Sequence, residues 1–144
     1  MKRFKNDNFI KKHTMYEDSI VRFLSLEPER EGRDRSNGRF YRLMALVNGI
    51  ENEYIINVHQ AVSGIDESGR PLWDLQFENT GGYFPDIEYI ERINGSRLSN
   101  GEAGYIMDEW KRQYYTDPEL LEEAKRYGDP DIIDKIERTR KEYQ

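Results

Sequence analysis

Two stretches near the middle of the chain alternate clearly between apolar and polar residues, the pattern of a strand with one face on a core. The first stretch, residues 54–62, carries four apolar side chains on one face: Tyr54, Ile56, Val58 and Val62. The second, residues 73–78, carries three: Trp73, Leu75 and Phe77. Residues 63–71 between them are rich in turn-forming glycine, serine, aspartate and proline. The sequence therefore predicts a β-hairpin over residues 54–78, with Trp73 and Phe77 in the core.

Residues 39–47 fit two periodicities. One apolar row alternates as in a strand, and a second row, spaced by three and four residues, fits the face of a helix. The dipeptide Asn48-Gly49 that follows is a strong hairpin signal, because both residues tolerate positive φ. We therefore predict a strand here, and a small antiparallel sheet of at least three strands, in meander order, over residues 39–78.

Two segments are predicted to be helices mainly from their end signals. A capping-box sequence that begins at Thr14 and the later Pro28 bracket a helix over residues 15–27. Pro85 suits the first turn of a second helix, which Gly95 would end.

A third helix is predicted over residues 103–115 from its apolar stripe. Its members recur at three- and four-residue spacing, as one helical face requires: Ala103, Ile106, Met107, Trp110 and Tyr114. Ser99 and Glu102 form a possible capping box just before it. Trp110 lies in the middle of the stripe, so we expect it to anchor the helix on the sheet.

A short repeat lies near the end of the sequence. Asp117-Pro118 is followed by an acidic residue, and the same arrangement recurs at Asp129-Pro130. Aspartate can cap a helix whose first residue is proline, and Gly128 can end the first copy. The pattern predicts two short helices near 118–127 and 130–143, a peripheral helical pair within 117–144. Two copies are too few for a repeat solenoid.

Composition places these elements in a small polar domain. Of 144 residues, 36% are hydrophobic and 35% charged, so we expect a small core inside a heavily charged shell. We predict one α+β domain over residues 1–144, with residues 1–12 and 28–38 flexible. The chain has no cysteine, which excludes disulfides and thiolate chemistry. No apolar run has the length of a signal peptide or a membrane span, so we expect a soluble cytoplasmic protein that binds no membrane.

Negative charge is concentrated in the middle of the chain. The formal net charge is −6, yet residues 43–110 alone carry −9 because acidic residues there far outnumber basic ones. Such a field acts on the choice of partner and on the rate of association. We therefore expect a basic protein surface to bind six carboxylates that the pattern places outward: Asp66, Glu67, Asp74, Glu78, Asp86 and Glu88.

Two alternative functions rest on other residues. Four arginines beside Phe40 and Tyr41 provide the groups that contact phosphates and stack on bases: Arg30, Arg33, Arg35 and Arg39. Interleaved acidic residues cancel much of their field, and no nucleic-acid-binding motif accompanies them. The other alternative is a small hydrolase in which His59 acts with scattered carboxylates such as Asp66 or Asp74. The sequence has no motif for a cofactor, a metal or a catalytic nucleophile, so we predict neither cofactor nor enzymatic activity.

In size, acidity, lack of cysteine and lack of a catalytic motif, the chain is similar to small accessory proteins of phages and mobile elements. Many proteins of that type bind and block a host enzyme. The resemblance is one of composition, and it implies a binding protein that inhibits a nucleic-acid-handling enzyme. The sequence does not indicate an oligomeric state.

Overall fold

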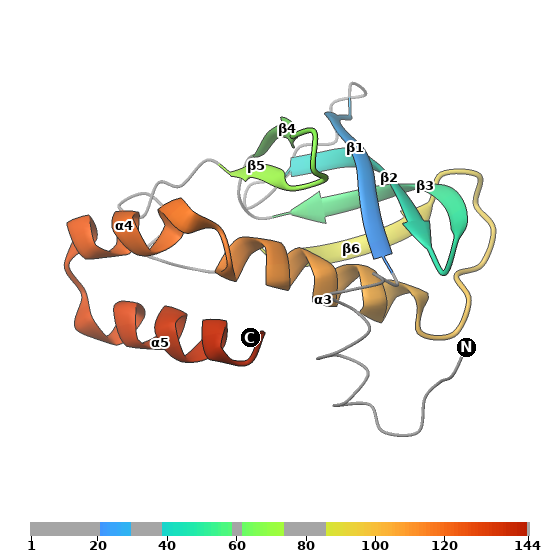
Figure 1. Cartoon of the computed structure of the whole chain (residues 1–144). Coiled ribbons are helices and arrows are strands. Elements are labelled where there is room, and N and C mark those ends of the chain that lie inside the picture. The colour runs from blue at the N-terminus through green and yellow to red at the C-terminus, as the bar shows by residue number, and fades with distance from the viewer. Residues whose placement is uncertain (1–20, 30–38, 59–61, 74–85, 144) are drawn as a thin grey trace.

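The computed structural model describes residues 21–29, 39–58, 62–73 and 86–143. Within them the chain forms six strands and three helices (Figure 1). The strands are β1 (Val21–Pro28), β2 (Arg39–Val47), β3 (Ile50–Val58), β4 (Val62–Ile65), β5 (Pro71–Trp73) and β6 (Ile87–Arg92). The helices are α3 (Glu102–Tyr115), α4 (Pro118–Tyr127) and α5 (Pro130–Lys141). The predicted α+β class is therefore confirmed, and no helix among the described residues is long and apolar enough to cross a membrane.

Four strands form an antiparallel sheet in the order β1-β2-β3-β6. The strand prediction for residues 39–47 is confirmed. Asn48 and Gly49 make the turn from β2 to β3 with φ of 54° and 81°, the positive values that the Asn-Gly signal implies. The three strands β1, β2 and β3 follow one another as a meander, and β6 returns to pair with β3.

One face of this sheet carries the core, and α3 lies across it (Figure 1). Ile106 and Trp110 on α3 are fully buried among the apolar residues of this face. The Trp110 ring contacts Phe23 of β1 with centroids 5.9 Å apart, and Trp73 of β5 with centroids 5.1 Å apart. The predicted burial of Trp110 is confirmed. Trp73 is half-buried against the same core, and Phe77 lies outside the described residues.

The hairpin predicted over residues 54–78 is confirmed only near its turn. Val62 pairs with Trp73 in a separate two-stranded sheet, β4-β5. The residues before it, 54–58, belong to β3 and pair with β2 and β6. A single alternating run thus supplies strands to two sheets. Residues 59–61 and 74–78 lie outside the described part.

The β4-β5 hairpin packs against β1 and the end of α3. Gly69 lies so close to the Phe23 carbonyl that an added Cβ would be 2.9 Å from the oxygen, so only glycine fits there. Arg70 donates a hydrogen bond of 3.0 Å to the carbonyl of Gln113, one of the last carbonyls of α3. A cation at a helix C-terminus is favoured by the helix dipole.

The two C-terminal helices are confirmed. Asp117 and Asp129 accept hydrogen bonds of 2.9 Å from the amides of Glu119 and Asp131, and Gly128 ends α4 with φ of 89°. The two helices pack on each other and on the last turn of α3 through a second small core. Its buried members are Tyr114, Tyr115, Leu120, Ala124 and Ile136.

The helix predicted over residues 15–27 is wrong for the part that the structure describes, because residues 21–28 form β1. A β-bulge lies between Phe23 and Ser25, where β1 has one more residue than β2. The extra residue places Phe23 and Leu26 on the same buried face at a spacing of three, which imitates a helical stripe. Residues 15–20 lie outside the described part, as do the predicted flexible segments except Pro28 and Glu29.

The helix predicted after Pro85 is wrong for the same physical reason. Residues 87–92 form β6, which has a register shift opposite Asn57 and Val58. The shift brings Ile87 and Ile90, three residues apart, onto one face.

Candidate functional site

The face of the four-stranded sheet that points away from α3 carries rows in which charged and apolar side chains mix. Residues directly opposite one another in neighbouring strands share a face. One row runs through all four strands, and its members in strand order are Glu27, Arg42, Ile55 and Glu91. The next two rows cross the first three strands: one is Ser25, Met44 and Glu53, and the other is Arg22, Leu46 and Glu51, in which Arg22 is exposed.

We call the four carboxylates of these rows, Glu27, Glu51, Glu53 and Glu91, the acidic sheet face. Glu27 and Glu51 are exposed, and Glu53 and Glu91 are partly exposed. Arg42 lies between them with its Nε 3.2 Å from a Glu53 oxygen, an ion pair in which the N–H is not aligned for a hydrogen bond. The other end of the same face, at Phe40 and Asn57, is buried. The accessible carboxylates therefore lie toward the β2-β3 turn.

Two of the six acidic residues predicted to bind a partner, Asp66 and Glu67, lie in the exposed turn between β4 and β5. Asp66 accepts hydrogen bonds from the Arg70 amide at 3.0 Å and from the Ser68 amide at 2.9 Å and hydroxyl at 2.8 Å. These bonds, first of all the one from Arg70, lower the pKa of Asp66 below its ordinary value. Its charge organises the turn, whereas Glu67 beside it is simply exposed.

Two further members, Asp86 and Glu88, lie at the start of β6, and both are exposed. Asp86 accepts a hydrogen bond of 2.8 Å from the Ile87 amide and so caps the strand. Glu88 is on the same strand as Glu91, at the register shift between Ile87 and Tyr89. Asp74 and Glu78 lie outside the described residues.

Most residues of the two alternative functions also lie outside the described part of the chain: Arg30, Arg33, Arg35 and His59. Arg39 is the first residue of β2 and is paired with Val58. Within the described residues, no group of three or more His, Asp and Glu side chains is arranged to hold a metal ion.

Glu102 is almost fully buried, at 2% exposure, on the inner side of the sheet. Arg92 donates to it at 2.7 and 3.2 Å, the Ser99 amide and hydroxyl donate at 2.8 and 2.9 Å, and the Tyr54 hydroxyl donates as well. Burial alone would raise the pKa of Glu102, but the hydrogen bonds from Arg92, Tyr54 and Ser99 outweigh it and lower the pKa to about 2. Burial and the bond to Glu102 raise the pKa of Tyr54 well above its ordinary value.

This cluster modifies the predicted capping box. Ser99 does contact Glu102, but Gly101 occupies the N-cap position with φ of 84° and α3 begins at Glu102. A second buried carboxylate, Glu109, accepts from Arg112 at 2.6 and 2.9 Å and from Gln113 at 2.6 Å. Both carboxylates are engaged by several donors inside the fold. Glu102 ties the start of α3 to β3 and β6, whereas the bonds to Glu109 lie within α3, and all four carboxylate oxygens accept hydrogen bonds.

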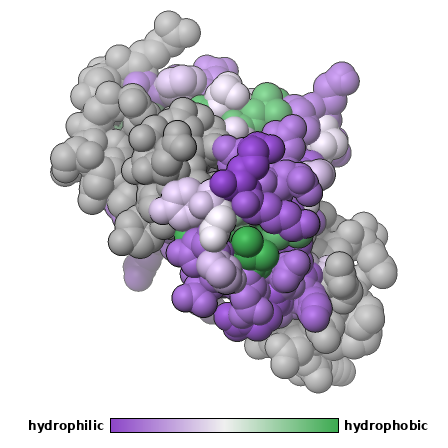
Figure 2. Space-filling view, turned by 90° about the vertical axis from the view of Figure 1, so that its left-hand side faces the viewer, coloured by the Kyte–Doolittle hydropathy of each residue, from purple (hydrophilic) through white to green (hydrophobic). Residues whose placement is uncertain are grey.

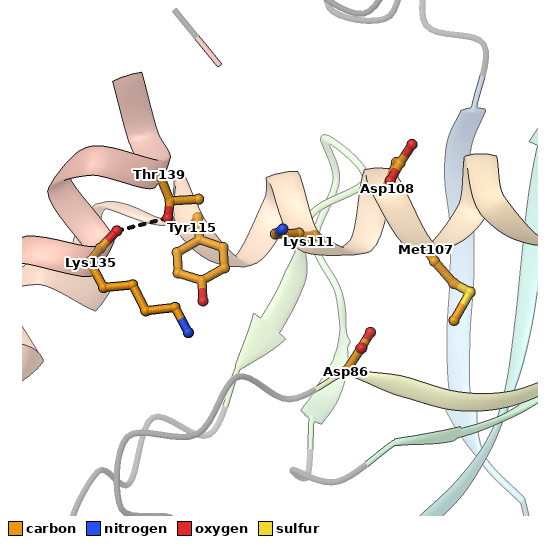
Figure 3. Close-up of a pocket in the computed structure, with 7 residues that line it drawn as sticks. All are labelled: Asp86, Met107, Asp108, Lys111, Tyr115, Lys135 and Thr139. Atoms are coloured by element: carbon orange, nitrogen blue, oxygen red, sulfur yellow. Dashed lines mark hydrogen bonds between the residues drawn. The ribbon is translucent and has the colours of Figure 1, made fainter. Parts of the chain in front are cut away.

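An open groove of about 290 Å³ lies between α3, α5 and the start of β6 (Figure 3). The residues that line it are Asp86, Met107, Asp108, Lys111, Tyr115, Lys135 and Thr139. In Figure 3 the Lys135 side chain and the Tyr115 hydroxyl extend toward the side on which Asp86 lies, whereas Asp108 points away. Burial, and then Asp86, raises the pKa of the Tyr115 hydroxyl. Two lysines and two aspartates balance in charge, so the groove favours no ligand by its sign.

Sequence reasoning missed all four members of the acidic sheet face. Glu27 was assigned to a helix, and Glu91 to the segment after Pro85. Glu51 and Glu53 carried a readable signal, because they alternate with Asn52 and Tyr54 directly after the hairpin turn.

No protein-family model, curated protein or solved structure matches the chain.

Proposed function

We propose that the chain is a non-enzymatic binding protein that presents its acidic sheet face to a basic surface of a protein partner and occludes that surface. The observation that carries the proposal is the cross-strand arrangement of Glu27, Glu51, Glu53 and Glu91. These carboxylates come from three strands and share the face that points away from α3. Glu88 on β6 and Glu67 in the β4-β5 turn add exposed negative charge.

The rigidity of the sheet supports this role. β3, which carries Glu51 and Glu53, is hydrogen-bonded on both sides, to β2 and to β6. Side chains on a preformed backbone lose less conformational freedom on binding than side chains on a loop that must be ordered. Complementary charge then acts mainly on the rate of encounter and on the choice of partner.

The class of partner that we propose is a nucleic-acid-handling enzyme. Adjacent strands are spaced by about 4.8 Å. The carboxylates on β1, β3 and β6 therefore spread negative charge across the width of the sheet, with Arg42 of β2 among them. A groove that binds a phosphate backbone uses lysine and arginine, which such a surface complements. A protein that occupies the groove would inhibit the enzyme in the cytoplasm, as the similarity to phage and mobile-element accessory proteins suggests. Direct binding of nucleic acid is disfavoured because both surfaces are negative.

The test is affinity capture from cell lysate with three proteins. The first is the wild type, and the second carries Glu27→Lys, Glu51→Lys and Glu91→Lys. The third is a matched control with Glu122→Lys, Glu137→Lys and Glu142→Lys, which changes exposed residues of α4 and α5 and the residue after α5. Both variants move the formal net charge from −6 to zero, so a difference between them reports the place of the charge and not its amount.

We expect the wild type and the control to enrich the same basic protein and the sheet-face variant to lose it. The recovered protein, once purified, should lose activity when the wild type is added. Equal recovery by all three proteins contradicts the proposal, and so does the absence of any protein that depends on the sheet face.

A further inference from the structure

Among the described residues β6 is an edge strand, and the backbone groups on its outer side have no strand partner. β3 pairs with one side of it, and no described strand pairs with the other. Hydrogen-bonded and non-hydrogen-bonded pairs alternate along an antiparallel ladder. The Ile93 amide donates to the Glu53 carbonyl at 2.9 Å, which fixes the alternation. The backbone amide and carbonyl of Glu91 therefore face β3, whereas the backbone amides of Ile90 and Arg92 face the side of β6 away from β3.

The opposite edge of the sheet, formed by β1, is protected from pairing with another chain. Exposed edges invite pairing with another chain, and proteins block them with proline or with a covering element. β1 ends in Pro28, and the β4-β5 hairpin lies against it at Gly69. Among the described residues nothing comparable covers the stretch of β6 at Ile90.

The side chains around this edge select the chemistry of an incoming strand. Glu88 and Glu91 are exposed and partly exposed carboxylates on β6. Arg92 is the one cationic residue of β6. Its guanidinium forms an ion pair of 2.7 Å with the buried Glu102 carboxylate, which offsets the repulsion that Arg92 would exert on a basic segment. Tyr89 and Ile93 are 45% and 39% exposed, so they offer apolar surface to the aliphatic stems of lysine or to valine.

We propose that the outer edge of β6, which no described strand covers, binds an extended, basic segment of the partner protein by adding it to the sheet as a further strand. In this mode, main-chain hydrogen bonds contribute affinity and alternate side chains contribute specificity. The inference rests on the proposed function for the basic character of the partner. A second copy of this chain is a poorer occupant, because it would bring two acidic surfaces together.

The test uses a defined probe, the acetylated and amidated peptide Lys-Val-Lys-Val-Lys-Val-Lys. A control peptide of equal charge replaces the central valine with proline, which removes a donor and prevents strand geometry. Titrations of the isotope-labelled full chain, followed by amide hydrogen exchange, report each backbone amide separately. We expect the amides of Ile90 and Arg92 to exchange rapidly in the free protein and to become protected at saturation.

We expect the control peptide to bind about fivefold to tenfold more weakly, as the loss of one or two main-chain hydrogen bonds implies. The pair Glu88→Lys and Glu91→Lys should also weaken binding of the first peptide, whereas Glu122→Lys with Glu137→Lys should not. Equal binding of both peptides overturns the proposal. So does a lack of protection at saturation, protection of Ile90 and Arg92 in the free chain, or self-association through this edge.

The outcome separates the two proposals. In one outcome the capture of the partner depends on Glu27 and Glu51, and the peptide does not protect the β6 amides. The acidic sheet face is then the interface, and strand addition is eliminated. In the other outcome the peptide protects the β6 amides, and the sheet-face substitutions do not change which protein is captured. The edge of β6 is then a peptide site, and the proposed function is eliminated.

Discussion

Glutamate has opposite roles on the two sides of the four-stranded sheet. On the inner side, α3 carries Glu102 and Glu109, which are each 2% exposed and accept hydrogen bonds from several donors. On the other face, Glu27 and Glu51 are exposed. A buried carboxylate requires compensation for the water that it loses, and its partners then fix the surrounding elements. An exposed carboxylate contributes little to stability and keeps its charge available to a partner.

The contrast shows where charge is structural and where it is available. The hydrophilic surface extends beyond the sheet: Figure 2 shows the end of the molecule at α4 and α5, where hydrophilic residues dominate the described surface around small hydrophobic areas. A hydrophilic surface alone therefore does not mark an interface. The sheet face differs in having its carboxylates set on paired strands.

The largest expected effect is on the inner face, where Trp110 fills the space between α3 and the sheet. We expect Trp110→Ala to lower the free energy of unfolding by about 3–5 kcal/mol, the usual cost of truncating a fully buried aromatic residue. Denaturant unfolding followed by circular dichroism measures it. A cost below about 1 kcal/mol would mean that α3 does not seal this face.

Glu102→Ala should be nearly as damaging. It removes the carboxylate to which Arg92 and Tyr54 donate. Breaking a buried ion pair usually costs about 3–5 kcal/mol, and we expect about 3 kcal/mol because Arg92 is partly exposed. The matched control is Glu51→Ala on the outer face, which should cost under about 0.5 kcal/mol. If the two variants lower the free energy of unfolding equally, the buried and the exposed glutamates do not differ in their contribution to stability.

Acid should lower the free energy of unfolding through protonation of the same residue, Glu102. The pKa of Glu102 in the folded protein is about 2, below its ordinary value of 4.5, so the folded state favours the ionised form. The resulting stability is fully present above about pH 4.5 and is lost as the pH falls toward about 2, a loss of about 3 kcal/mol. Glu102→Gln should flatten this part of the unfolding profile. Parallel profiles for the wild type and the variant would show that another group carries the dependence.

The smallest expected effect is on the outer face. The combined change Glu27→Lys, Glu51→Lys and Glu91→Lys should alter the free energy of unfolding by less than about 1 kcal/mol, because exposed and half-exposed charges interact weakly through water. Thermal melts at low and high salt check it. A loss of several kcal/mol would place these carboxylates in the fold itself and would argue against their being reserved for a partner.

Elements whose signals are local could be predicted from the sequence. Asn48-Gly49 gave the turn from β2 to β3, and Asp117, Asp129 and Gly128 gave the ends of the C-terminal helices. The apolar stripe through Trp110 gave α3. Each signal acts within a few residues, so the rest of the fold does not alter it.

The two wrong helices share a cause that local patterns do not reveal. In β1 and in β6 a bulge shifts the register, and it places Phe23 with Leu26, and Ile87 with Ile90, on one face at helical spacing. Only the partner strand identifies the extra residue.

The candidate site depended on the same missing information. A row such as Glu27 with Glu91 exists only after four strands have paired in a defined register, and its members are far apart in the sequence. Glu102 was found as a capping residue, but its partner Tyr54 is 48 residues away and could not be predicted from spacing. Glu88 was predicted correctly as an exposed acidic residue; its role in binding stays a prediction.

The central claim is that the acidic sheet face is the interface. Its most direct test is the association rate constant with the purified partner recovered by capture, measured by stopped flow over a range of ionic strength for the wild type, the triple sheet-face variant and the control on Glu122, Glu137 and Glu142. We predict that the sheet-face variant associates at least about tenfold more slowly at low salt, that the control stays within about twofold of the wild type, and that the difference shrinks near 0.5 M salt, where the Debye length is about 4 Å. A sheet-face variant that associates as fast as the wild type at low salt would contradict the claim.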